Sequence, residues 1–403
     1  MSPARRHEVP FPLRRLDRRA VDIVRRLNED GFEAYLVGGC VRDHLLGMTP
    51  KDYDIATSAR PGQVRRLFRR SRIIGRRFKI VHVYAGREIY EVSTFRRVPK
   101  QGKGEITAPI RDDNAFGTAE EDALRRDFSV NGLFLNPGAH EIVDFVGGME
   151  DLEKRQLISI GPPDLRFRED PVRILRLIKF MRRLHLSAGP EEVEATRTHA
   201  QLLRQSAEPR VVEEVFRLMQ TGDMEGVWAD LCALDLVSIL LPDIAGWLRS
   251  DPDSPSREQR MSTLFRCMDD WILDGGEPGY GFRLAVLYGA WAEAEWSPES
   301  QCLGLRDPRH APVALLQVLQ LRARFPRAAI TRGVHILQAQ LDLDPDAGSS
   351  KSRRRKRGWQ ERLLAQDEFP EALEFLRCRL VAADRDLAPY DEWHELSESF
   401  HAK

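Results

Sequence analysis

Two adjacent glycines between a short apolar stretch and a helix constrain the fold more than any other feature of the sequence. Residues 34–37 are apolar and predict a buried strand, after which Gly38 and Gly39 follow at once. Residues 41–46 then predict a short helix. Glycine lets a backbone approach a phosphate closely, and Arg42 can add a charged fork at the turn. The order strand, glycine turn, helix therefore predicts an α/β domain with a phosphate site, although such glycine pairs also occur in ordinary turns.

A pair of aspartates follows this turn closely. Asp52 and Asp54 lie in a predicted second strand over residues 52–56, where residues two apart point to the same face. Carboxylates about 6–7 Å apart repel each other unless a cation or water screens them. Hard divalent ions such as Mg²⁺ prefer oxygen ligands of this kind. An exposed strand with two solvated acids is the alternative, but the position of the pair after the glycine turn favours a metal site.

A third acid, Glu91, lies on a later predicted strand. Residues 79–84 and 88–94 read as two strands around a turn, and the second could pair beside the strand that carries the aspartates. Glu91 could then complete the metal site or lie next to it. A surface or salt-bridged glutamate is the alternative.

Arg126, Asp127 and Asn131 form the next polar cluster. Asp127 and Asn131 are four residues apart and share a face if this stretch is helical. Arginine suits a phosphate, whereas Asn and Asp suit sugar hydroxyls, so the cluster could bind a nucleotide. A capped helix end with a structural aspartate is the alternative.

A fourth cluster combines Asp170, Arg173 and Arg176. Pro171 and the acids before it mark the start of a helix, expected over residues 169–184. The spacing of three places the three side chains on one polar stripe, where donors and acceptors could recognise the edge of a nucleobase. An intrahelical salt-bridge stripe is the alternative.

The pattern along the chain predicts a small α/β head followed by a long helical body. From about residue 119 onward the periodicity is mostly helical, whereas residues 98–117 lack periodicity and predict a loop. We expect the head over residues 1–150, a helical neck region over residues 151–250, and a helical body and tail over residues 251–403.

The charges are distributed unevenly along a chain whose formal net charge is zero. Residues 1–100 hold 23 Lys and Arg against 11 Asp and Glu, and residues 351–357 contain six basic side chains in seven. Such segments suggest surfaces that face a polyanion, and the basic run could grip an RNA backbone. A solvated helix surface, or for residues 351–357 a solvated linker, is the alternative.

The remaining composition restricts the compartment and the class of protein. The five cysteines are scattered and predict neither a disulfide framework nor a zinc site. No apolar run approaches the roughly 20 residues of a membrane span, and the basic N-terminus lacks the apolar core of a signal peptide. We therefore expect a cytoplasmic protein with no membrane segment.

Five motifs, taken together and in order, resemble the class II tRNA nucleotidyltransferase and bacterial poly(A) polymerase superfamily. They comprise residues 36–43, 51–54, 125–131, 144–152 and 168–173. The resemblance implies an α/β nucleotidyltransferase head, built from a small mixed sheet with helices, followed by all-α neck, body and tail domains.

The resemblance also implies roles for single residues. In this superfamily the Asp-x-Asp acids bind Mg²⁺, and Mn²⁺ is a second candidate. The Arg-Arg-Asp-x-x-x-Asn motif contacts ribose and phosphate. The Glu-Asp-x-x-Arg helix contacts the incoming base. The expected catalytic residues are Asp52, Asp54 and Asp127. The expected nucleotide-binding residues are Gly38, Gly39, Arg42, Arg126, Asn131, Asp170, Arg173 and Arg176. The expected metal ligands are Asp52, Asp54 and Glu91.

Residues 73–83 resemble the poly(A) polymerase branch of this superfamily, and residues 168–173 and the C-terminal part favour the same branch. The expected activity is template-independent addition of AMP from ATP to the 3′ end of RNA, with release of diphosphate by a two-metal in-line mechanism. A CCA-adding or A-adding tRNA nucleotidyltransferase is the first alternative, and a catalytically silent RNA-binding protein is the second. The motifs leave the oligomeric state open.

Overall fold

The computed structural model describes residues 4–75, 79–97, 115–250, 255–295, 325–346 and 358–402. The chain divides into two compact units, which are described one at a time. Unit 1 comprises Met1–Glu169 and Leu184–Ala195, and unit 2 comprises Asp170–Arg183 and Thr196–Lys403. The basic run 351–357 and part of the expected loop, residues 98–114, lie outside the described residues.

Unit 1 is built on one mixed sheet of eight strands, in the order β1-β8-β7-β2-β3-β6-β5-β4. The strands are β1 Arg5–Glu8, β2 Ala34–Val37, β3 Asp54–Thr57, β4 Ser71–Ile74, β5 Ile80–Ala85, β6 Glu88–Thr94, β7 Leu133–Asn136 and β8 Glu141–Asp144. Neighbouring strands run antiparallel except β3 and β6, which are parallel. The predicted α/β head is confirmed.

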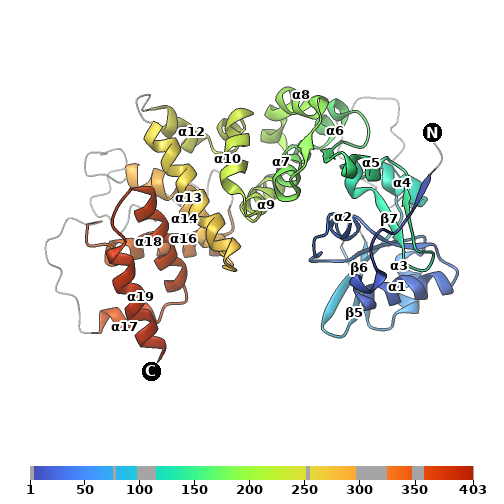
Figure 1. The fold of residues 1–403 in the computed structure, drawn as a ribbon, viewed down its shortest axis with the longest axis horizontal. Helices are drawn as coiled ribbons and strands as arrows, with labels where there is room; N and C mark the ends of the chain where they lie inside the picture. The colour runs from blue at the N-terminus through green and yellow to red at the C-terminus, as the bar shows by residue number, and fades with distance from the viewer. Residues whose placement is uncertain are drawn as a thin grey trace. The chain divides into compact units, whose positions relative to one another are not determined.

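Short helices accompany the sheet in the blue to green part of the chain (Figure 1). They are α1 Arg18–Glu29, α2 Gly39–Leu45, α3 Pro61–Leu67, α4 Ala119–Leu124, α5 Gly148–Glu153 and α6 Pro163–Glu169, together with α8 Pro190–His199, which belongs to unit 1 up to Ala195. Helix α1 begins where the side chain of Asp17 accepts hydrogen bonds from two amides of the first turn. One face of this helix packs into the core, because Ile23, Val24 and Leu27 are buried. Each such side chain contributes about 1.5–3 kcal/mol relative to an exposed one.

A cluster of buried hydrophobic side chains joins the sheet to α4. It contains Tyr35, Val37, Ala56, Phe95, Ala119, Ala123, Phe134 and Val143. Side chains alternate between the faces of a strand, so Asp54, at the start of β3, lies on the same face as Ala56 and borders this cluster. The core therefore stops where the predicted metal-binding acids begin.

Helix α5 supports the loop that carries the Arg126 cluster. The buried carboxylate of Asp144 accepts hydrogen bonds from four successive amides, those of residues 146–149, and so caps the helix. Gly148 packs so closely on Ser129 that a Cβ atom would overlap the Ser129 carbonyl oxygen. Asp151 accepts a hydrogen bond of 2.5 Å from the Ser129 hydroxyl. These contacts hold the 3-10 turn η2 Ser129–Asn131 in place.

Unit 2 is helical in its described part. Its helices are α7 Val172–Leu184, α9 Glu208–Leu218, α10 Met224–Ala233, α11 Val237–Leu240, α12 Pro242–Arg249, α13 Pro255–Leu273, α14 Tyr280–Glu295, α16 Arg327–Leu343, α17 Trp359–Leu364, α18 Phe369–Ala382 and α19 Ala388–His401. Helices α13, α14, α16 and α18 pack against one another around buried aromatic side chains such as Phe282 and Phe375. No helix in the described part of the chain is long and apolar enough to span a bilayer.

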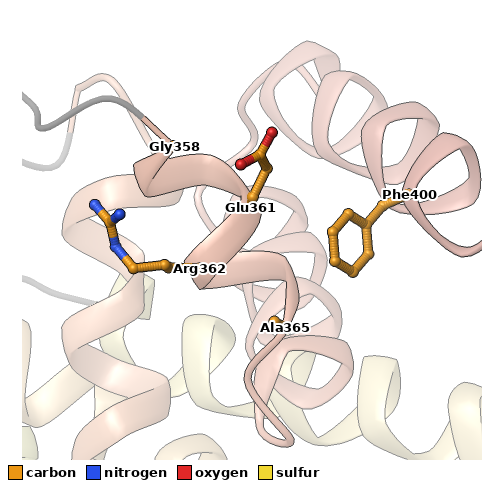
Figure 2. Close-up of a pocket in the computed structure, with 5 residues that line it drawn as sticks. All are labelled: Gly358, Glu361, Arg362, Ala365 and Phe400. Carbon is orange, nitrogen blue, oxygen red and sulfur yellow. The ribbon is translucent and has the colours of Figure 1, made fainter.

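A cavity of about 480 Å³ lies between α17 and α19 in unit 2. Figure 2 shows the side chains that line it, which are Gly358, Glu361, Arg362, Ala365 and Phe400. None of the residues predicted to bind nucleotide or metal belongs to this lining.

Two expectations about single elements are wrong. The strand expected over residues 52–56 begins only at Asp54, so Asp52 precedes it. The helix expected over residues 169–184 is interrupted, since α6 ends at Glu169 and α7 starts at Val172. The residue before a proline avoids the helical region, which explains the break at Asp170. Strands β1, β4 and β7 were not expected.

Substituting Gly148 tests how strongly α5 supports the neighbouring turn. We expect Gly148→Ala to lower the free energy of unfolding by about 1–3 kcal/mol, because the new methyl group overlaps backbone that cannot move away. The matched control is Gly62→Ala in α3, where a Cβ meets nothing within 4 Å. Alanine favours a helix, so the control should gain about 0.5–1 kcal/mol. Urea unfolding measures both, and equal stabilities would contradict the packing argument.

Candidate functional site

The glycine turn, one aspartate and one arginine converge at the end of β2. Gly38 has φ 72° and ψ −131°, a conformation that side chains with a Cβ rarely adopt. A Cβ on this residue would lie 3.1 Å from Arg126 Nη1 and 3.9 Å from Asp54 Oδ2. Helix α2 begins with the next residue, Gly39. The structure thus brings together residues that lie far apart in the sequence, around a backbone that a ligand can approach closely.

The acids gather at the start of β3. Asp54 and Glu91 are direct partners in the parallel register of β3 and β6, which confirms that the two strands are neighbours. Asp54 remains accessible to solvent but is surrounded closely by protein, and this desolvation raises the pKa of its carboxyl group. The negative charges of Glu91 and Asp52 raise this pKa further, whereas Arg126 lowers it.

This donor set suits a divalent cation, which would offset the repulsion between the acids. Among the residues that the structure describes, no group of three or more His, Cys, Asp or Glu side chains could hold a metal alone. Mg²⁺ usually binds through one or two carboxylates together with substrate phosphates, so Asp52 and Asp54 fit this mode. Glu91 also lies 3.3 Å from His82 Nε2, and its role as a metal ligand stays a prediction.

A buried hydrogen-bond network lies behind the glycine turn. Arg42, which is 3% exposed, donates to Asp43 Oδ1 through Nε at 2.8 Å and Nη2 at 2.5 Å. Its Nη1 donates to Asn131 Oδ1 at 2.5 Å, and Asn131 Nδ2 donates to Asp127 Oδ1 at 3.0 Å. Asp127 and Asn131 therefore meet through this bond rather than on an α-helix, since only a 3-10 turn forms there.

The Arg126 side chain extends this network towards Gly38. Its Nη2 donates to Asp122 Oδ2 on α4 at 3.0 Å, and its Nη1 donates to the carbonyl oxygen of Asn131 at 3.2 Å. The guanidinium carbon lies 5.1 Å from the centre of the Phe134 ring. These contacts fix a positive charge next to the acids.

Sequence reasoning missed Arg166 on α6. Its Nη2 donates to the carbonyl oxygens of Arg125 and Arg126, each at 3.0 Å, and so holds the backbone of that motif. Main-chain carbonyl groups are common to all residues, so no pattern of residue types could reveal this contact.

The predicted base-contacting residues lie in unit 2. Asp170 accepts two hydrogen bonds from Arg210 on α9, at 3.1 and 2.8 Å. Arg176 Nη1 lies 3.6 Å from Glu214 Oε1. The amide of Arg173 donates to the Asp170 carbonyl oxygen at 3.1 Å, as expected for the start of a helix. Two residues of the expected polar stripe, Asp170 and Arg176, therefore face charged side chains of α9.

Lys179, which sequence reasoning also missed, strengthens the contact between α7 and α9. Its ammonium group donates to Glu214 Oε2 at 2.6 Å. Burial lowers the pKa of Lys179 to about 8, and the neighbouring Arg176 acts in the same direction.

Comparison with known proteins adds an independent line of evidence. Residues 34–158 match the family described as the poly A polymerase head domain. The chain is 34% identical to poly(A) polymerase I of Salmonella typhimurium over 392 residues, which cover 93% of this chain and 81% of that protein. The chain belongs to the bacterial poly(A) polymerase family. Residues 189–248 of this family member match a region described as a probable RNA- and SrmB-binding site of polymerase A.

The family also has CCA-adding relatives. A CCA-adding enzyme of Streptococcus pneumoniae is 34% identical over 272 residues, which cover 67% of this chain and 64% of that protein. The crystal structure of the Bacillus stearothermophilus CCA-adding enzyme in complex with CTP has a TM-score of 0.65 at 26% identity, covering 95% of this chain and 81% of that one. The Thermotoga maritima CCA-adding enzyme complexed with tRNA has a TM-score of 0.60 at 19% identity, with coverage of 97% and 85%, and shares the fold.

Replacing the Asp54 carboxylate by a neutral amide should raise the stability of this poly(A) polymerase family member. A raised carboxyl pKa in the folded state means that ionisation costs stability at pH values above that pKa. Without divalent ions, we expect Asp54→Asn to unfold at a higher urea concentration than the wild type at pH 8. The difference should shrink as the pH falls and the wild-type carboxyl becomes protonated. A variant that is less stable at pH 8 would contradict this electrostatic account.

Proposed function

We propose that this enzyme transfers AMP from ATP to the 3′ end of RNA and releases diphosphate, without a template. The observation that carries the proposal is the convergence of Gly38, Asp54 and Arg126, which combines a close backbone approach, a carboxylate for a metal and a fixed positive charge. The identity of 34–35% to bacterial poly(A) polymerase I proteins over 93% of the chain supports adenylate as the nucleotide.

In the proposed reaction the RNA 3′-hydroxyl oxygen attacks the α-phosphorus of ATP in line with the leaving group. The new O–P bond forms as the bond between the α-phosphorus and the bridging oxygen breaks, and the hydroxyl proton is lost to water. Divalent ions, for which Mg²⁺ is our first choice and Mn²⁺ our second, would supply Lewis acidity at both oxygens. No covalent enzyme intermediate is required, so positioning and charge stabilisation carry the acceleration.

The protein residues divide this work in our proposal. Asp52 and Asp54 bind the cation, with Glu91 as a third candidate, and Arg126 stabilises the charge of the phosphates. Asn131 and Asp127, held to each other by a hydrogen bond, contact the ribose. The buried position of Arg42 favours an indirect part, in which it holds Asn131 and the helix that follows the Gly38-Gly39 turn.

Base recognition is assigned to α7 and to Asp170, which lies two residues before it. Asp170, Arg173 and Arg176 offer an acceptor and two donors, which an adenine edge can use. The two bonds from Arg210 fix the carboxylate of Asp170 in one orientation, and a fixed acceptor discriminates between bases better than a mobile one.

Replacing either aspartate should abolish catalysis. We expect Asp52→Ala and Asp54→Ala to lower AMP incorporation at least about a thousandfold while far-UV circular dichroism stays unchanged. The matched control is Asp22→Ala on the exposed face of α1, where the carboxylate pairs with Arg25 of the same helix. Incorporation is measured with radiolabelled ATP and a short RNA. Wild-type rates in either site variant would exclude its role in metal binding.

The choice of nucleotide and RNA decides between the two enzymatic alternatives. The purified protein is offered ATP or CTP, together with either unstructured RNA or tRNA that lacks its 3′ terminus. Long adenylate tails on the unstructured RNA are the expected product. Incorporation of CTP that halts after a few nucleotides on tRNA would instead identify a CCA-adding enzyme.

A further inference from the structure

Asp52 differs from the other acids in how it is held. Pairing of β3 with both of its neighbours, β2 and β6, begins at Asp54, so Asp52 and Tyr53 precede the ladder. Hydrogen bonds of the sheet therefore fix Asp54 and Glu91 but do not extend to Asp52. A metal ligand must nevertheless be held within a few tenths of an ångström of its productive position. The residue between the two aspartates is the nearest candidate for this support.

The Tyr53 side chain is anchored on helix α2. Its hydroxyl group shares a hydrogen bond of 2.8 Å with Nε2 of His44, and the two ring centres are 5.9 Å apart. His44 is 8% exposed and stacks on Phe11 at 5.1 Å with an interplanar angle of 28°. Because α2 begins at the glycine turn, this anchor links the segment of Asp52 to the helix behind the predicted phosphate site.

A second tyrosine occupies the equivalent place beside Glu91. Side chains alternate along a strand, so Tyr90 points to the face of the sheet opposite Glu91. Its hydroxyl donates to Oδ1 of Asp17 at 2.9 Å, the same carboxylate that caps α1. Tyr90 is therefore anchored at the start of α1, as Tyr53 is anchored on α2.

We propose that Tyr53 and Tyr90 are positioning residues, which hold the metal-binding acids from the opposite face of the sheet. Tyr53 carries the larger share, since Asp52 has no ladder pairing of its own, whereas β6 pairs with a strand on each side. This inference rests on the proposed function, in which these acids bind a divalent cation. It adds a supporting set of side chains, His44, Tyr53, Tyr90 and Asp17, that contact neither nucleotide nor metal in that scheme.

The test measures metal binding directly rather than through activity alone. Mn²⁺ is titrated into the full chain with an unreactive ATP analogue, and free Mn²⁺ is followed by electron paramagnetic resonance. We expect Tyr53→Phe, which removes one oxygen atom, to raise the Mn²⁺ concentration at half-saturation about tenfold, as loss of an outer support of a metal ligand commonly does. His44→Leu should reproduce the defect, and Tyr90→Phe should show a smaller one. Saturating Mn²⁺ should restore most of the AMP incorporation of Tyr53→Phe.

Two controls make the outcomes distinct. Tyr84→Phe on β5 removes a hydroxyl group from the same sheet outside the anchors and should bind Mn²⁺ like the wild type. Asp54→Ala tests the proposed function itself, because the same titration should lose the site altogether. If Asp54→Ala binds Mn²⁺ normally, the metal site is misassigned and the positioning role falls with it. If Asp54→Ala loses the site while Tyr53→Phe and His44→Leu keep wild-type affinity, only the positioning role is overturned, even where their melting temperatures fall.

Discussion

Repulsion between carboxylates at the start of β3 is the constraint on which the rest of the head depends. The parallel register places Asp54 directly beside Glu91, and Asp52 adds a third negative charge nearby. A fold gains nothing from such a grouping unless something positive joins it. Arg126 supplies a permanent positive charge from one side, and in our proposal the cation of a metal–nucleotide complex supplies the rest. In this proposal the acids lower the stability of the free protein, and binding of the metal–nucleotide complex offsets their repulsion.

The contacts around the acids hold Arg126 in place. Arg126 must stay where it is in the absence of ligand, and it is held through its side chain by α4 and through its main chain by Arg166. The turn that follows it is supported by α5, which the buried Asp144 carboxylate caps. The bonds from Arg166 and to Asp144 end on main-chain atoms, so they fix the course of the backbone on either side of Arg126.

The sequence pattern predicted those parts of the head that neighbouring residues determine. The Gly38-Gly39 turn, the acids after it and the strand of Glu91 were predicted because apolar periodicity, glycine and aspartate each have a direct structural meaning. The pattern did not reveal that β1 forms an edge of the sheet, because its partner β8, which contains Asp144, lies more than a hundred residues later in the sequence. Arg166 was missed because its partners are main-chain carbonyl groups. The break at Asp170 could have been predicted from the proline that follows it.

The two outermost strands of the sheet determine how the head behaves towards other copies of itself. An uncovered edge offers unpaired amide and carbonyl groups, to which a strand of another chain can add. Here β1 and β4 each have only four residues, and both carry arginine, at Arg5 and Arg6 in one and Arg72 in the other. Short edges that carry charged side chains disfavour the addition of another strand, so we do not expect two copies of the head to join through the edges of their sheets.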